Sequence, residues 1–248
     1  MTKAESKVID FIKKHILLFL LVAVTIIAIF LRVCGMDFQS DDFNSFLNSW
    51  WSIIKLNDFT GLATQVGNYN IPYQVIIYLM TLLPLNALYA YKIVSIIFDF
   101  VLAISTAMLV YSFAKNNRRL KAILTYSAVL LSATVIFNSS FWAQCDSIYT
   151  SFIILAILFL HKDKPIASFV FIGIAFAFKL QTVFIIPVLL YYWISTKKIS
   201  ILHFFIIPAL DVIMCLPAII MGRPFIDIIT IYAVSYTHLR AHETLANL

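Results

Sequence analysis

An apolar run without a single charged residue occupies positions 16–31, where the sequence reads ILLFLLVAVTIIAIFL. Across the chain, 62% of the residues are hydrophobic and only 12% are charged. A soluble domain carries about 45–50% apolar and about 25% charged residues, so one core of 248 residues cannot bury this surplus. We therefore expect lipid to be the solvent for much of the chain, and we predict an all-α, polytopic membrane helix bundle.

The longest apolar segments predict about seven spanning helices in one domain over residues 1–233. Their expected bounds are 16–32, 88–114, 122–137, 148–160, 166–178, 182–194 and 201–221. Several are shorter than the roughly 20 residues of a straight span, so we expect their ends to extend into the polar flanks. No small-residue cleavage site follows the first segment, which indicates an uncleaved anchor rather than a signal peptide.

The basic residues indicate how this bundle is oriented. Segment 71–83 is apolar but short, with Pro72 and Pro84 near its ends. If it crossed the membrane, the basic loop 115–121 would face outward, whereas an interfacial helix leaves every basic cluster on one side. Those clusters are Lys3, Lys7, Lys13 and Lys14; Lys115, Arg118, Arg119 and Lys121; Lys162 and Lys164; and Lys197 and Lys198. Because Lys and Arg mark the cytoplasmic side, we predict a multi-pass cell-membrane protein with a cytoplasmic N-terminus. The net charge of +6 then indicates orientation and not nucleic-acid binding.

The remaining loops share the extracytoplasmic face under this topology: 33–87, 138–147, the turn around 179–181, and 222–224. Their polar residues are Asp41, Asp42, Gln144, Asp146, Lys179, Gln181 and Arg223. The first loop is too apolar for a free linker, and residues 43–56 place apolar and aromatic side chains close to helical period. We therefore expect two interfacial helices in loop 33–87, with Asp42 at the start of the first.

Two interpretations of the adjacent acids stay open. Asp41 and Asp42 follow Ser40 and can cap the helix, because carboxylates accept its free N–H groups and suit its positive end. The alternative is a general base at the mouth of a membrane cavity, and a capping contact that fixes a carboxylate is compatible with that role. Asp146, at a helix start in WAQCDSIYT, allows the same two interpretations.

The cations of the outer face also have a structural and a functional interpretation. Lys179 and Arg223 either anchor the chain at the lipid headgroups or belong to a polar pocket. Gln181, two residues after Lys179, favours the pocket, and Trp142 suits a membrane interface.

Lys92 and Asp99 lie inside the helix 88–114, two turns apart on one face. Ionisable groups in a span face the bundle interior and find partners. We therefore predict a structural pair between them first, and support of the site second. Asp211, deep in the last segment, has no explanation from the sequence.

The chain shows no apparatus for a soluble activated donor. It has only five glycines and no Gly-rich phosphate loop. Its three cysteines have no paired spacing, so neither a disulfide framework nor a zinc site is implied. Any activated group that this chain transfers must arrive already in the membrane.

The last residues, 234–248, change character abruptly. Residues 234–244 match an in-frame translation of a transposon-type sequencing adaptor. We interpret 234–248 as a non-native tail, reject a metal site at His238, His242 and Glu243, and expect genomic DNA to differ after Ala233.

The outer-face motifs, in order, resemble those of bacterial relatives of the GPI-anchor mannosyltransferases, which are membrane glycosyltransferases of the GT-C fold. The motifs are SDDF…FLNSWW, NYNIPY…LLPLN, K-x6-DF at 92–100, NSSFWAQCDSIY, GIAFAFKLQ…P and GRPF. The resemblance covers about residues 16–230, and WAQCDSIY with FKLQ…P is its most specific combination. Family members usually have Gly where this chain has Ala143, and they carry further helices.

The resemblance implies a polyprenyl-phosphate sugar as donor, with a hexose such as mannose as the sugar. It implies an acceptor hydroxyl from a glycan, lipid or protein, and no tightly bound cofactor, while the need for a divalent metal stays open. The family pattern of acid, aromatic, two residues, apolar pair and Trp selects Asp42 as the general base of an inverting displacement. Lys179 or Arg223 would offset the charge of the leaving phosphate, and Asp146 would orient sugar or acceptor. Gln144 and Gln181 join these as binding residues, and Asp41, Trp142, Lys92 and Asp99 as supporting ones.

Two other classes of protein compete with this one. A transporter or lipid-carrier flippase predicts broken helices at the midplane and inverted repeats, whereas this chain gathers its polar groups at one face and shows no repeat. An assembly subunit without chemistry would tolerate replacement of Asp42.

Overall fold

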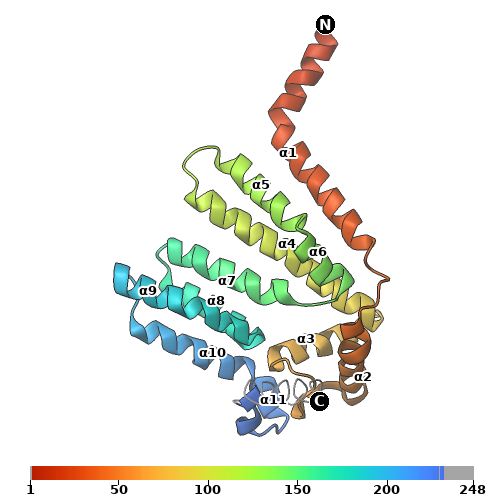
Figure 1. The fold of residues 1–248 in the computed structure, drawn as a ribbon, viewed down its shortest axis with the longest axis vertical. Coiled ribbons are helices and arrows are strands. Elements are labelled where there is room, and N and C mark those ends of the chain that lie inside the picture. The colour runs from red at the N-terminus through yellow and green to blue at the C-terminus, as the bar shows by residue number, and fades with distance from the viewer. Residues whose placement is uncertain (1, 229, 232–248) are drawn as a thin grey trace, which may run out of the picture.

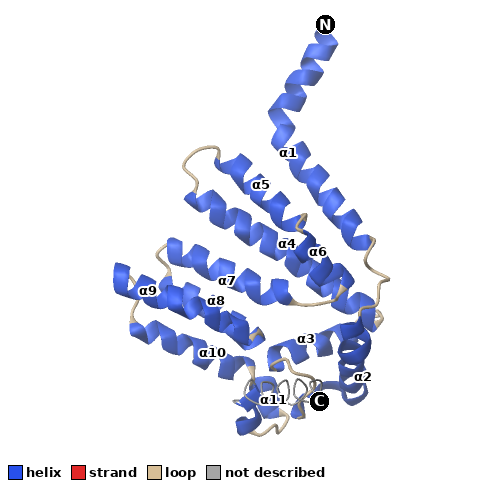
Figure 2. Cartoon of the chain, in the orientation of Figure 1, coloured by secondary structure: helices blue, strands red, loops and turns tan. Residues whose placement is uncertain are grey.

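The computed structural model describes residues 2–228 and 230–231, and all regular secondary structure in that part of the chain is helical (Figures 1 and 2). The predicted all-α class is therefore confirmed. The helices are α1 (Lys3–Val33), α2 (Asn48–Asn57), α3 (Ile71–Thr81), α4 (Ala87–Phe113), α5 (Arg118–Leu130), α6 (Ala133–Ile136), α7 (Asp146–His161), α8 (Pro165–Phe178), α9 (Ile186–Thr196), α10 (Ile206–Met214) and α11 (Leu216–Ile220). Short π or 3-10 turns are η1 (Phe43–Leu47), η2 (Asp58–Ala63), η3 (Phe137–Phe141), η4 (Leu180–Ile185) and η5 (Ile201–Phe205). The non-native tail proposed for 234–248 lies outside the described residues.

The long helices pack side by side in the order α5, α4, α7, α8 and α10, and α1 lies along α5 (Figure 1). Apolar residues of α1, α4 and α5 form one buried cluster around Ala28, Ala103 and Leu130. A second cluster, around Phe169 and Ile172 of α8, holds α7, α9 and α10 together. α4 therefore lies between α5 and α7. This arrangement places loop 33–87, which precedes α4, and loop 138–147, which precedes α7, at one end of the bundle.

Two helices in the described part of the chain are long and apolar enough to cross a membrane. They are α1, with 31 residues and a mean hydropathy of 3.0 in its most apolar stretch, and α4, with 27 residues and 2.4. The pair Arg118–Leu130 and Ala133–Phe141 passes the same test together but is bent by 51°. The structure thus supports a membrane protein, and the count of about seven spans stays a prediction.

Three of the predicted spans are broken and are not continuous helices. Segment 122–137 bends after Leu130, segment 182–194 begins with η4, and segment 201–221 divides into η5, α10 and α11. Proline lacks a backbone N–H and disfavours helical geometry in the preceding residue, so it is tolerated in the first turn of a helix and disrupts a helix interior. Pro187 and Pro217 occupy the first turns of α9 and α11, as this rule requires.

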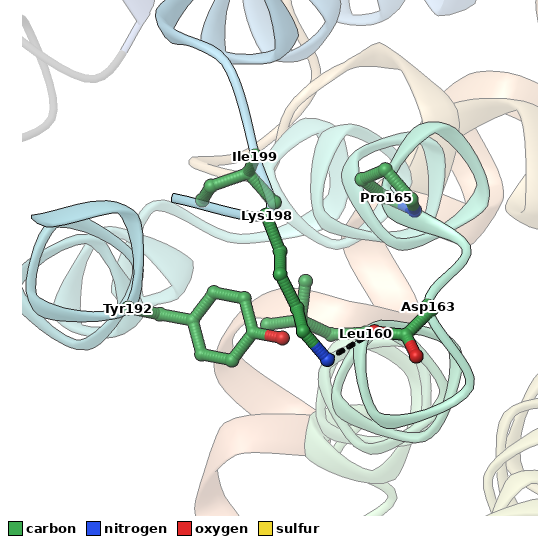
Figure 3. A pocket seen from close by; sticks show the side chains of 6 residues that line it. All are labelled: Leu160, Asp163, Pro165, Tyr192, Lys198 and Ile199. Carbon is green, nitrogen blue, oxygen red and sulfur yellow. Dashed lines mark hydrogen bonds and ion pairs between the residues drawn. The ribbon is translucent and has the colours of Figure 1, made fainter. Parts of the chain in front are cut away.

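The basic loops and the predicted site loops lie at opposite ends of the bundle (Figure 1). At the basic end, Phe113 stacks on His161 with ring centroids 3.9 Å apart, and Lys198 binds Asp163 at 2.8 Å (Figure 3). At the other end, the two helices predicted in loop 33–87 are present as α2 and α3, and α3 lies across the ends of the bundle helices. The loops sort as predicted, while the membrane orientation stays a prediction.

Candidate functional site

Two π-helical turns position the main site residues. η1 begins directly after Asp42, and η3 ends directly before Trp142. Such turns insert an extra residue into a helix and occur frequently at functional sites. After η3 the backbone N–H of Gln144 donates to the carbonyl of Asn138 at 2.8 Å, which directs the Gln144 side chain toward Asp42.

Asp42 and Asp41 have different surroundings although both are exposed. Asp42 Oδ2 accepts a hydrogen bond from Gln144 Nε2 at 2.9 Å, across 102 residues of sequence. Asp41 has no hydrogen bond or ion pair with any described residue. The helix is capped by Ser40, whose Oγ accepts from the N–H of Phe43 at 3.2 Å. Neither acid makes a side-chain capping hydrogen bond with a described residue, so the capping interpretation is wrong for both.

Tyr69, which was not predicted as a site residue, extends the contact from Asp42 into the protein. Its hydroxyl donates to Gln144 Oε1 at 3.2 Å. Burial raises the pKa of Tyr69 well above its ordinary value, with Cys145 and Asp146 adding to the effect. The phenol therefore stays protonated and remains a donor at neutral pH.

Lys179 and Asp146 form an ion pair beside Tyr69. The ammonium also lies 5.6 Å from the ring centres of Tyr69 and Tyr149, a favourable position for a cation. Asp146 Oδ2 accepts a second hydrogen bond, from Asn138 Nδ2 at 3.0 Å. Asp146 stands in the first turn of α7 without a side-chain capping bond, so its capping interpretation is also wrong. The connected residues, named here the polar line, are Asp42, Gln144, Tyr69, Lys179, Asp146 and Asn138.

Cys145 lies between Gln144 and Asp146 but is not a nucleophile. Burial raises the pKa of its thiol to about 11. A thiol is reactive only as thiolate, so the buried Cys145 is inert at neutral pH.

Arg223 approaches the polar line from the other side, through Gln65 and Gln74. Its Nη2 donates to Gln65 Oε1, and Gln65 and Gln74 each donate to the backbone carbonyl of Tyr69, at 3.1 and 2.9 Å. Arg223 is 4% exposed, and its Nε and Nη1 have no partner among the described residues. Burial lowers the pKa of Arg223. Buried unpaired donors are costly, and guanidinium groups suit oxyanions, so this position can accept an anion.

Two predicted residues are less closely connected. Gln181 is exposed and makes no hydrogen bond with the described residues of the polar line. Trp142 is half exposed, and only its backbone carbonyl reaches the site, where it accepts from Ser40 Oγ at 3.4 Å.

The predicted pair between Lys92 and Asp99 is wrong. Lys92 and Asp99 are seven residues apart in α4, a rise of about 10.5 Å along the helix axis. The ammonium and the carboxylate therefore bind different partners at different heights along α4. The Lys92 ammonium donates to the carbonyls of Gly35, Met36 and Phe38 at 2.7, 3.0 and 2.5 Å.

Asp99 binds Arg32 instead, with Nε to Oδ2 at 2.9 Å, and also accepts from Ser139 and Ser147. All four side chains are buried. Arg32 was not predicted as the partner of Asp99, because it ends an apolar run, and an Arg at that position ordinarily anchors a helix at the lipid headgroups.

Asp211, unexplained by the sequence, accepts from Asn70 Nδ2 at 3.0 Å. Asn70 also caps α3, since its Oδ1 accepts from the N–H of Ile71 at 2.8 Å. Asp211 thus joins α10 to the loop that carries Tyr69. The pattern Asn before Ile-Pro was the signal available for this cap.

Within the described residues, no group of three or more His, Cys, Asp or Glu side chains is placed to hold a metal ion. Comparisons with protein-family models, curated proteins and solved structures gave no match for this chain.

Proposed function

We propose that this protein is an integral membrane glycosyltransferase of the GT-C type. It would move a sugar, a hexose such as mannose, from a polyprenyl-phosphate carrier to an acceptor hydroxyl at the extracytoplasmic face. The observation that carries the proposal is the hydrogen bond between Gln144 and Asp42, at the head of the polar line. It supports the assignment made from the motif register, which selected Asp42 and not Asp41.

The chemistry is one inverting displacement at the sugar carbon. Gln144 holds Oδ2 of Asp42, which leaves Oδ1 for the acceptor hydroxyl. Asp42 takes the acceptor proton while the new C–O bond forms and the bond to phosphate breaks. The electron pair of the broken bond leaves with the lipid phosphate.

Two cations are available for the departing phosphate. Lys179 is engaged by Asp146, whereas Arg223 keeps two nitrogens, Nε and Nη1, unpaired among the described residues. This difference favours Arg223 as the first contact of the phosphate, with Lys179 adding charge. Asp146, held by Asn138 and Lys179, is positioned to orient the sugar or the acceptor.

The test compares Asp42→Asn with Asp41→Asn in membranes that contain the full-length protein and labelled polyprenyl-phosphate sugars. A general base contributes about 10²–10⁴ in rate, so we expect Asp42→Asn to lose transfer by at least about a hundredfold at normal protein levels. Asp41→Asn is the matched control and should stay within a few-fold of wild type. Equal activities of the two variants, or loss only in Asp41→Asn, would refute the assignment.

A transporter or lipid-carrier flippase is the second candidate. The 51° bend between α5 and the segment Ala133–Phe141 favours it, because broken helices are typical of transporters. Carrier movement across vesicles without sugar transfer, unaffected by Asp42→Asn, would support this candidate over the enzyme.

A further inference from the structure

A groove of about 760 Å³ lies between α1, α4 and α5, at the end of the bundle that carries the basic loops. Its lining is mostly apolar and includes Leu21 of α1, Met108 of α4 and Ile123 of α5. Small-molecule sites occupy roughly 300–1,000 Å³, so the groove is large enough for part of a lipid.

The depth of the groove matches one leaflet of a bilayer. It runs along α4 from Ser112 to Ile104, which is about 12 Å at 1.5 Å per residue. Half of a hydrocarbon core of roughly 30 Å is about 15 Å. The flanking helices α1 and α4 are those long and apolar enough to cross a membrane, so lipid has access to the groove.

The interior of the groove requires no polar ligand. Thr25 and Tyr126 contribute hydroxyl groups to its wall. These hydroxyls lie 3.0 Å apart and satisfy each other, and Thr25 also donates to the carbonyl of Leu21 at 2.8 Å. A hydrocarbon chain therefore suits the interior.

The mouth of the groove carries unneutralised positive charge. Arg118 and Lys162 line it, and both are exposed. Arg118 is held there, since its Nε donates to the carbonyl of Tyr111 at 3.1 Å and its guanidinium lies over that ring. The acid beside Lys162 is Asp163, and Lys198 engages it at 2.8 Å (Figure 3). The mouth is therefore complementary to an anionic headgroup.

We propose that this groove binds an anionic phospholipid, with one acyl chain between α1, α4 and α5 and the phosphate at Arg118 and Lys162. The lipid would hold α1 against the bundle. The mouth of the groove lies at the opposite end of the bundle from α2 and α3, so the proposal does not depend on glycosyl transfer (Figure 1).

The test is native mass spectrometry of the protein, purified in neutral detergent and mixed with equal amounts of phosphatidylglycerol and phosphatidylcholine that carry the same acyl chains. We expect wild type to retain phosphatidylglycerol at least about tenfold better. The double variant Arg118→Gln/Lys162→Gln should lose this preference. The matched control Lys7→Gln/Lys13→Gln removes the same charge from an exposed part of α1 outside the groove and should keep it.

A second variant tests the apolar part of the groove. Met108 is 46% exposed, so Met108→Trp fills the groove from the surface without disturbing the core. The Met108→Trp variant should lose retention of both lipids and should elute from size-exclusion chromatography as wild type does. If its elution differs from that of wild type, Ala122→Leu takes its place. Equal retention of the two lipids by wild type would overturn the proposal. Equal loss of the phosphatidylglycerol preference in the two charge variants would also overturn it. Unchanged lipid retention by the variant with the filled groove would do the same.

Discussion

Ala143 shows how one backbone conformation shapes the site. Its φ is +56°, in the left-handed region, and its side chain is fully buried in the apolar cluster that includes Phe43, Trp51 and Tyr91. A residue with a Cβ pays about 1–2 kcal/mol for this conformation, whereas glycine adopts it freely. Members of the family that the sequence resembles usually have Gly at this position, and the positive φ gives a physical reason for that preference.

Substitutions at Ala143 should therefore divide by backbone tolerance. A β-branched residue at positive φ is a steric outlier, and extra methyl groups overpack a buried site. We expect Ala143→Val to lower the free energy of unfolding by at least about 2 kcal/mol. Ala143→Gly, the control, should stay within about 1 kcal/mol of wild type. Thermal unfolding of the three proteins in detergent measures the difference, and a valine variant as stable as wild type would contradict the assigned backbone.

Among the elements, the loop between α1 and α2 depends on Lys92 of α4. The ammonium is fully buried and binds three carbonyls of this loop. Gly35 in the same loop allows no side chain, since a Cβ would lie 2.8 Å from the ring of Phe141. The loop that leads to Asp42 is thus fixed between α4 and η3, and Lys92 is a positioning residue.

Lys92→Met keeps the apolar stem and removes the three hydrogen bonds. Buried acceptors left without a donor cost about 1–3 kcal/mol. We therefore expect backbone amides of residues 38–43 to exchange hydrogen roughly tenfold faster or more, with the amides of α10 unchanged. Lys55→Met, at an exposed position of α2, is the control and should leave exchange as it is in wild type. No change in residues 38–43 would show that Lys92 does not hold the loop.

The buried ion pair between Arg32 and Asp99 joins α1, α4, α5, η3 and α7. Arg32 ends α1 and also donates to the carbonyl of Leu130 at the end of α5. Asp99 lies in α4 and accepts from Ser139 of η3 and Ser147 of α7. The pair therefore sets the packing beneath the polar line.

Removing one partner of this pair should cost more than removing both charges. Arg32→Met leaves Asp99 buried without its cation, and such a loss costs about 3–5 kcal/mol. The double variant Arg32→Met/Asp99→Asn removes both charges, keeps an acceptor oxygen for one serine and places an NH2 donor beside the hydroxyl of the other, so it should recover part of that stability. Arg119→Met removes an exposed charge and serves as the control. If the double variant proves less stable than Arg32→Met in thermal unfolding, the buried charge is not the cause.

The whole molecule has two chemically distinct ends. One end carries the loops with Lys115, Arg118, Lys162 and Lys198, and the other carries the polar line (Figure 1). Because Lys and Arg loops stay on the cytoplasmic side, the two ends should lie on opposite sides of the membrane.

Single cysteines test this arrangement. Cys34 is exposed and must first be replaced by Ser, whereas Cys145 and Cys215 are buried. Asn44→Cys and Asn116→Cys place probes at exposed positions of the two ends. An impermeant maleimide should label Asn44→Cys from outside intact cells and Asn116→Cys only after the membrane is opened. Labelling of both from one side would refute the topology.

The helical class, most helix positions and the sorting of polar loops were predicted because these properties depend on residues near one another in sequence. The sequence predicted that Asp42, Gln144, Asp146 and Lys179 share one face of the membrane, but it did not predict their contacts. Tyr69 was missed, since an interfacial tyrosine is ordinary in such a loop. The capping role of Asp41 and Asp42 was wrong because Ser40 lies directly before the helix and its Oγ accepts from the N–H of Phe43.

The sequence by itself determined which stretches are apolar enough for lipid, which loops are basic and which acid matches the motif. Only the tertiary structure decided the partners of the buried ions. Arg32 and Asp99 lie 67 residues apart, and Asp42 and Gln144 lie 102 apart. Such contacts follow from α4 packing between α5 and α7, an order of helices that no local pattern specifies. Helical periodicity gives the face on which a side chain lies, whereas its partner depends on which helix covers that face.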